Sequence, residues 1–312
     1  MPVLLDAVQG AEETVAMLWA GATVAAAAFQ VARNAFQRGM MASSGPWGAT
    51  LVRFLFGLPI SIALMLAAIA VVGPQHLHPQ LGWAFWWPAL LGALAQVLAT
   101  AALLQAMHHA GFAVGTALQQ SSVPLAALAG LLVFGDTLSP LGWLGVGVTT
   151  AGLAVLVWPR DVGGEGRLLP GVVFGTLSGL LFGLALNGFR HAGLSLEPHH
   201  PFFAAMTSVT LVQAVQTVAL VAFLLWRDPA ALRAVIAGWR GSLGAGLFGA
   251  LASSGWFFAL NLAPAAAVRS LGVVEMPIAA VAGHRLFREA LSMRQAIAGL
   301  AVCVGVVLTA GL

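Results

Sequence analysis

The chain has 312 residues, of which 60% are hydrophobic and only 7% are charged, and its mean hydropathy is +0.95. These values exclude a soluble globular domain and predict an integral membrane protein. The net charge of +3 comes from 13 basic residues, all of them arginine, which are spread singly along the chain. The sequence therefore has no basic patch and predicts no nucleic-acid partner.

Long apolar segments, separated by glycine, proline, arginine and histidine, predict about ten membrane-spanning helices of roughly 20 residues each. Their expected ranges are 14–37, 48–72, 83–107, 112–134, 139–158, 170–192, 201–226, 242–262, 264–287 and 293–312. The connection 228–239 is among the longest, and we expect a short helix at the membrane interface there.

The two halves of the sequence align with each other without a gap at a shift of 153 residues. Because proline, tryptophan, asparagine and acidic residues are rare here, their matches indicate an internal duplication. We therefore expect a first repeat at 1–158, a connecting loop at 159–169 and a second repeat at 170–312. The matched pairs include Pro124 with Pro277, Trp86 with Trp239, Asn34 with Asn187, and Asp136 with Glu289.

A repeat that crosses the membrane five times forces the next repeat into the opposite orientation. The arginines agree with this inversion, because cytoplasmic loops are enriched in basic residues. Loops after the first, fifth, seventh and ninth spans hold most of them, whereas Arg190 alone marks the sixth. The pattern predicts cytoplasmic odd-numbered loops and extracytoplasmic termini. The arginines concerned are Arg38, Arg160, Arg167, Arg227, Arg233, Arg240, Arg285, Arg288 and Arg294.

Glu275 is the sharpest functional candidate, because it is a carboxylate in the middle of an apolar span. Arg269 lies six residues earlier, about 9 Å along a helix axis, and could reach toward it from the same helix. One interpretation is an acid that couples transport to protons or binds substrate. The other is a structural hydrogen bond to a neighbouring helix.

Pro124 and Pro277 each remove a backbone donor, and we expect them to bend their helices at equivalent positions. Matched interruptions of this kind point to the central site of a carrier. The four residues 119–122, Gln-Gln-Ser-Ser, cover the whole helix circumference, so at least one of them faces the interior. Hydrogen bonding between helices, without a ligand, is the alternative.

Several other polar or aromatic residues have two interpretations each. Asn34 and Asn187 either cap and pack helices or contact a ligand. Trp19 and Trp256 lie deeper than the tryptophans at the ends of the expected spans, such as Trp83 and Trp226. They either line a cavity or pack against other helices. Arg53 opens the second span and is expected to snorkel or pair, with binding of a substrate anion as the alternative. A stripe on the seventh span, which faces another helix or a cavity, consists of Thr207, Thr210, Gln213 and Thr217.

The sequence lacks the motifs of several enzyme and pump classes. It has no Walker sequence, dinucleotide fingerprint or nucleophile elbow, so an ATP-driven pump is disfavoured. The adjacent pairs His108–His109 and His199–His200 are poor chelators of a single ion, since neighbouring residues rarely bind one metal well. We expect no metal and no cofactor.

Two segments resemble a known family. Residues 122–155 contain P-L-A-A-L-A-G-L-L-V-F-G-D-T-L-S, and residues 275–308 begin with E-M-P-I-A-A-V-A-G-H-R-L-F-R-E-A-L-S. They resemble the two EamA-type repeats of the drug/metabolite transporter superfamily, as do Trp19 and Arg53. The resemblance implies a ten-helix fold whose central cavity opens to one side at a time, and export of amino acids or related metabolites. Asp136 stands where the family commonly has glutamate.

We therefore expect an all-α integral membrane protein of the cell (inner) membrane, with ten transmembrane helices as two inverted five-helix repeats around a central cavity. Its expected function is export of small metabolites such as amino acids by a secondary transporter with alternating access. A passive channel or facilitator is the alternative, and an intramembrane enzyme lacks a catalytic pair. The expected partners are a small-molecule substrate and the lipid bilayer; proton coupling, and the choice between monomer and homodimer, stay open. The substrate-binding candidates are Trp19, Asn34, Gln96, Gln120, Ser122, Asn187, Trp256, Arg269 and Glu275.

Overall fold

The computed structural model describes residues 2–134, 140–157 and 168–288, together with 293, 297, 300, 301 and 303–305. These residues form helices and no strand, which confirms the predicted all-α class. Most of the expected connecting loop at 159–169 and of the last expected span lies outside the described residues. The matched acids Asp136 and Glu289 lie outside them too.

The helices follow the expected apolar segments closely. The first half contains α1 (Pro2–Leu55), α2 (Leu58–Val72), the 3-10 turn η1 (Pro74–His76), α3 (Trp83–Ala110), α4 (Phe112–Gln119), α5 (Ser122–Ala129), the π-helical η2 (Gly130–Phe134) and α6 (Pro140–Val157). The second half contains α7 (Leu168–Leu196), α8 (Pro201–Arg227), α9 (Pro229–Ala237), α10 (Trp239–Leu262), α11 (Ala265–Leu271), η3 (Gly272–Val274) and α12 (Glu275–Phe287). The short helix expected within 228–239 is therefore present as α9.

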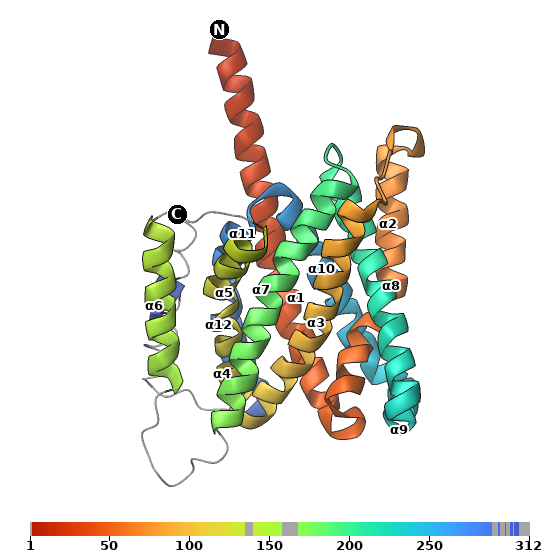
Figure 1. The fold of residues 1–312 in the computed structure, drawn as a ribbon, viewed down its shortest axis with the longest axis vertical. Helices are drawn as coiled ribbons and strands as arrows, with labels where there is room; N and C mark the ends of the chain where they lie inside the picture. The colour runs from red at the N-terminus through yellow and green to blue at the C-terminus, as the bar shows by residue number, and fades with distance from the viewer. Residues whose placement is uncertain are drawn as a thin grey trace.

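Helix α1 reverses direction at Gly45, which has φ 63° and is followed by Pro46. This backbone conformation suits glycine, because side chains with a Cβ rarely adopt it. Across the reversal, Gln37 Nε2 donates to the carbonyl oxygen of Ala49 at 2.7 Å. Figure 1 shows α1 running to one end of the bundle before the chain returns toward α2. The reversal separates the first two expected spans.

Six segments of the described chain are long and apolar enough to cross a membrane. They are Glu13–Val72, Trp83–Ala110, Phe112–Val133, Leu169–Leu196, Pro201–Arg227 and Trp239–Leu262. The first of them includes the reversal at Gly45. The protein is therefore a multi-pass membrane protein, while the full set of ten spans remains a prediction.

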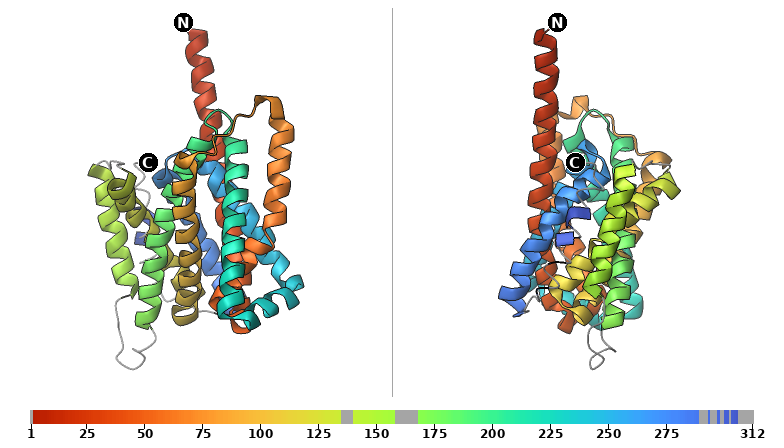
Figure 2. Two further views of the ribbon diagram at one scale, coloured as in Figure 1. Left: turned by 45° about the vertical axis from the view of Figure 1, so that its right-hand side comes forward. Right: turned by 90° about the vertical axis from the view of Figure 1, so that its left-hand side faces the viewer.

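Four long helices, α1, α3, α7 and α10, pack along one another in the bundle (Figures 1 and 2). Helices α3 and α7 are antiparallel, since Gly188 approaches Pro88 whereas Gly171 approaches Ala110. Helices α1 and α10 are also antiparallel. The C-terminal ends of α7 and α10 meet, where Arg190 donates to the carbonyl of Ala263. It follows that α1 and α7 run in opposite directions, as do α3 and α10.

The glycines of α10 allow close approach to the segment between α1 and α2. A Cβ on Gly246 would lie 2.6 Å from the backbone carbonyl carbon of Phe56. This close contact between small residues and backbone brings α10 against the chain that carries Arg53.

Candidate functional site

Two helices are interrupted inside the bundle. The first break separates α4 from α5 at Gln120 and Ser121, and the second separates α11 from α12 at Gly272–Val274. Each break precedes a proline, Pro124 or Pro277. In the first break, the carbonyl of Gln120 accepts from the amide of Val123 at 3.0 Å, since Pro124 has no amide hydrogen to offer. The breaks bring polar side chains together.

Glu275 is fully buried at the start of α12. It lies at the centre of these polar side chains, which together form a polar cluster. Its Oε2 accepts from Gln30 Nε2 at 2.8 Å and from Gln120 Nε2 at 3.4 Å. Gln30 in turn accepts at Oε1 from the indole Nε1 of Trp256 at 3.0 Å. Helices α1, α10 and α12 and the α4–α5 break are thereby tied to one carboxylate.

Arg269 of α11 provides the ion pair for Glu275. Its Nη1 lies 3.8 Å from Glu275 Oε2, and its Nη2 donates to Gln120 Oε1 at 2.9 Å and to Ser122 Oγ at 3.1 Å. The guanidinium also lies 5.2 Å from the ring centroid of Trp256, a distance that allows a cation–π interaction. The side chain of Arg269 is only 3% exposed, so this pair is inside the protein.

Two further arginines are buried beside this pair. Arg33 on α1 donates from Nε and Nη2 to Asn34 Oδ1, at 3.1 and 2.7 Å. Arg53 donates to Thr100 Oγ1 of α3 at 3.1 Å and to Ser253 Oγ of α10 at 3.2 Å. Each residue is 1% exposed. In the described part of the chain, both guanidiniums have neutral hydrogen-bond partners and no carboxylate in contact.

A small cavity of about 20 Å³ lies among these groups. That volume has room for about one water molecule, so a metabolite would need the surrounding helices to move. The residues that line the cavity are of two kinds, polar and apolar. The polar part is Gln30, Arg33, Arg53, Gln96, Gln119, Ser253 and Arg269, and the apolar part is Phe182, Leu186, Phe189, Trp256 and Phe257.

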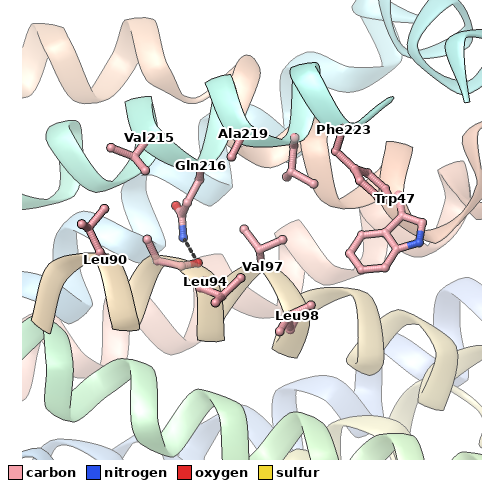
Figure 3. A pocket seen from close by; sticks show the side chains of 11 residues that line it. Trp47, Leu90, Leu94, Val97, Leu98, Val215, Gln216, Ala219 and Phe223 are labelled. Carbon is pink, nitrogen blue, oxygen red and sulfur yellow. Dashed lines mark hydrogen bonds between the residues drawn. The ribbon is translucent and has the colours of Figure 1, made fainter. Parts of the chain in front are cut away.

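A larger apolar groove of about 390 Å³ lies between α3 and α8. Figure 3 shows its leucine, valine and aromatic side chains and the hydrogen bond from Gln216 to the carbonyl oxygen of Ala93. Gln216 Nε2 donates to Gln96 Oε1 at 2.8 Å. Because Gln96 also lines the small cavity, this amide pair separates the groove from the polar cluster.

Comparison with known proteins identifies the first half of the chain. Residues 15–158 match the EamA-like transporter family. This segment is therefore similar to an EamA-like transporter domain. A solved crystal structure has a similar fold, with a TM-score of 0.54 over 96% of this chain and 97% of the other, at 18% identity. That identity shows the fold alone. Among curated proteins, no sequence matches.

The EamA-like domain supplies Gln96, Gln120 and Ser122 of the predicted site, and the second half supplies Trp256, Arg269 and Glu275. All six lie in the cluster or line its cavity. Asn34 lies there through its bonds from Arg33. The structure places the remaining two candidates elsewhere.

Trp19 and Asn187 are not among the residues that line the small cavity. Trp19 is half-buried against the hydrophobic core near the start of α1. Asn187 Nδ2 donates to the carbonyl of Gly183 one turn earlier in α7, at 3.0 Å.

Gln30, Arg33, Thr100 and Ser253 belong to the cluster but were not among the predicted residues. Gln30 and Arg33 are polar residues within the first apolar span, and that alone was a usable signal. Arg33 sits four residues from the expected end of the span, where arginines ordinarily snorkel to the interface. The predicted polar stripe of α8 faces other helices: Thr210 donates to the carbonyl of Ser61, and Gln213 to that of Arg53.

At the opposite end of the bundle from the Gly45 reversal, Glu197 joins two loops. Its carboxylate accepts from the backbone amides of His78 and His199, at 3.2 and 3.1 Å. Burial raises the pKa of Glu197, but these hydrogen bonds and the neighbouring His199 and His200 side chains outweigh it and lower the pKa below its ordinary value. Within the residues that the structure describes, no group of three potential metal ligands occurs.

Proposed function

We propose that the protein is a secondary transporter that exports small metabolites, such as amino acids, across the cell (inner) membrane by alternating access. The observation that carries this proposal is the buried polar cluster between two interrupted helices of a multi-pass protein with an EamA-like domain. Ionisable side chains at such depth are expensive and are typically retained for transport.

The opposite directions of α1 and α7, and of α3 and α10, support two inverted five-helix repeats, at 1–158 and 170–312. These four helices are the counterparts related by the shift of 153 residues. The interruptions at Gln120–Ser121 and Gly272–Val274 also correspond under that shift. Related halves that pack against each other offer the two arrangements that alternating access requires.

The size of the central cavity favours a carrier over a passive channel. A cavity of about 20 Å³ provides no continuous path for a solute. A substrate would enter only after helices separate on one side, and that movement is the defining step of a carrier.

The arrangement of arginines supports extracytoplasmic termini. Arg38 lies over the ring of Phe287, 4.1 Å from its centroid, so the first and ninth loops share one end of the bundle. The seventh loop lies at this end too, since Val235 of α9 packs beside Gly48. Basic residues gather on the cytoplasmic side of membrane proteins, which makes this the proposed cytoplasmic end.

Radiolabelled counterflow in proteoliposomes tests the transport function. Purified protein is reconstituted, and a panel of amino acids and related metabolites is assayed for saturable uptake driven by unlabelled internal solute. We expect at least one solute to show saturable counterflow. Flux without saturation or counterflow would support a channel instead.

The Glu275→Gln variant tests whether this carboxylate couples transport to protons. We expect counterflow to become independent of pH and uptake driven by a proton gradient to fall by at least tenfold, because the amide cannot exchange a proton. The control is Glu13→Gln, which alters an exposed acid near the start of the first span. Unchanged pH dependence in Glu275→Gln would leave Glu275 a structural role.

A further inference from the structure

We infer that the substrate is an organic anion, whose carboxylate or phosphate oxygens lie between Arg33 and Arg53 and whose apolar body packs on Phe182, Phe189 and Trp256. The inference rests on the proposed transport function and assigns its site a chemical class of substrate. The inference predicts a preference for net anions over zwitterionic amino acids, whereas the proposed function includes both.

The charges inside the cluster do not balance. Arg33, Arg53 and Arg269 are all buried, and among the described residues Glu275 is the one acid in the cluster. Its carboxylate contacts Arg269 directly and acts on Arg33 electrostatically. Even with Glu275 ionised, two positive charges remain in excess. A buried charge without a counterion is costly, so the cluster is built to receive negative charge.

The position of the excess charge defines where an anion would lie. Arg33 and Arg53 are on the two arms of the α1 hairpin, act on each other electrostatically and both line the small cavity. An oxyanion between them would relieve the repulsion between two like charges. It would also match the fork of donors on each guanidinium, since arginine binds carboxylate and phosphate in bidentate fashion.

Both guanidiniums retain donors for such a ligand. An arginine side chain has five N–H donors. Arg33 directs two nitrogens to the single oxygen of Asn34, and Arg53 directs two to the hydroxyls of Thr100 and Ser253. These neutral partners fix the orientation of the arginines without neutralising them. Gln119 Oε1, which also borders the cavity, is buried without a partner and could accept from a hydroxyl of the substrate.

Part of the cavity lining is aromatic. Phe189 stacks on Phe257 with ring centroids 4.4 Å apart, and Trp256 is held by its hydrogen bond to Gln30. Phe182 belongs to the same part of the lining and is 7% exposed. Rigid aromatic faces favour a flat, apolar body. The cavity therefore offers both charge recognition and apolar packing.

Cations and zwitterions fit this arrangement less well. An ammonium group beside Arg33 and Arg53 would be repelled by both. Glu275, the acid of the cluster that could attract it, is not among the residues that line the cavity. Its Oε2 already accepts from Gln30 and Gln120 and pairs with Arg269, and its Oε1 is buried without a hydrogen-bond partner. A zwitterion would also bring no net charge to offset the two positive charges in excess.

The test compares solutes that share a phenyl ring and differ in charge. Proteoliposomes are loaded with 3-phenylpropionate, phenyl phosphate, phenylalanine or phenethylamine, and counterflow of each labelled solute is measured. We expect the two anions to show saturable counterflow with at least tenfold higher efficiency than phenylalanine, and phenethylamine to show none. The ratio of the two anions tells whether carboxylate or phosphate is preferred.

Variants of Arg33 then test the assigned anion position. Arg33→Gln should lower the efficiency for the anions at least tenfold and leave that for phenylalanine within twofold, whereas Arg33→Lys should restore part of it. Arg240→Gln, at an exposed arginine on α10, is the control and should change nothing. The comparison of the four phenyl solutes uses the wild-type protein, so its result does not depend on whether a variant folds.

The outcomes separate this inference from the proposed function. Saturable counterflow of phenylalanine or phenethylamine that equals or exceeds that of both anions would leave a transporter and overturn the anion site. Equal loss of all solutes in Arg33→Gln and in Arg33→Lys would overturn the role of Arg33 in charge recognition. Absence of saturable counterflow for every solute, amino acids included, would overturn the transport function and the inference together.

Discussion

The polar cluster and the groove between α3 and α8 are neighbours with opposite properties. The cavity of the cluster measures about 20 Å³ and is lined by three buried arginines, amides and aromatic rings. The groove measures about 390 Å³ and is lined almost entirely by apolar side chains, with Leu94 60% exposed on its rim. The cavity is small and charged, and the groove is larger, more open and uncharged.

The size of a cavity in a membrane protein is therefore a poor guide to its function. An apolar groove on the flank of a spanning bundle costs little, because lipid chains can fill it. Buried arginines and a carboxylate are expensive in the same environment, and their retention therefore calls for a role. The smaller of the two cavities is the better candidate site.

The largest predicted effect is the loss of the buried ion pair. Arg269→Met leaves Glu275 without its cation and removes donors to Gln120 and Ser122. Breaking a buried pair typically costs about 3–5 kcal/mol. We expect a strongly lowered melting temperature in detergent and no counterflow. In the groove, Leu94→Ala should change stability by less than about 0.5 kcal/mol, as for exposed positions.

A double variant checks that the cost comes from the unpaired charge. Removing both partners of a buried pair is often close to neutral. Arg269→Met combined with Glu275→Gln should therefore melt at a higher temperature than Arg269→Met alone. If the two substitutions were simply additive, Glu275 and Arg269 would not be coupled, and the contrast between cluster and groove would lose its physical basis.

The helices were largely predictable because length and hydropathy are local properties. The helices α3, α8 and α10 begin and end near the expected positions, and α9 occupies the connection 228–239. The prolines located the interruptions of the fourth and ninth spans. The break between α1 and α2 at Phe56 and Gly57, inside the second expected span, is also followed by a proline, Pro59, but it was not predicted. Gly246 of the distant helix α10 packs against this break, a contact that the local sequence does not reveal.

The cluster was predictable only in part, because a rare polar residue marks depth but not direction. Glu275, Arg269 and Gln120 were expected, and they meet. Arg33 was missed because the end of an apolar segment does not tell whether an arginine snorkels outward or turns inward. Trp19 was expected to line the site, but it is not among the residues that line the small cavity. Which face of a helix points inward is decided by its neighbours, and one sequence does not name them.

A second prediction concerns how tightly the two regions are packed. Gly246→Val would place a Cβ 2.6 Å from the backbone of Phe56, so α10 would have to move away from the hairpin that carries Arg53. Overpacking of this kind typically costs about 1–3 kcal/mol. Ala219→Leu adds similar bulk to the groove, where space is available, and should stay within about 0.5 kcal/mol. Melting curves of both variants in the same detergent measure the difference.

Counterflow measurements on Gly246→Val and Ala219→Leu test the same difference in packing. Gly246→Val should also raise KM, because Arg53 moves with the hairpin, whereas Ala219→Leu should leave KM unchanged. Equal effects of the two variants would mean that the packing of α10 does not position the cluster.

The smallest predicted effect lies at Gln216, where the two regions meet. Gln216→Leu removes the donor to Gln96 Oε1 and to the carbonyl of Ala93, which accepts from Gln216 at 3.1 Å. A hydrogen bond contributes about 1 kcal/mol net, so the melting temperature should fall only slightly. Gln96, released from its partner, would lose its fixed orientation in the small cavity, and KM should rise two- to fivefold with kcat little changed. Val215→Leu, a groove substitution without a hydrogen bond, is the matched control and should leave KM unaltered. If Gln216→Leu and Val215→Leu had the same KM, the hydrogen bond between Gln216 and Gln96 would not orient Gln96 in the small cavity.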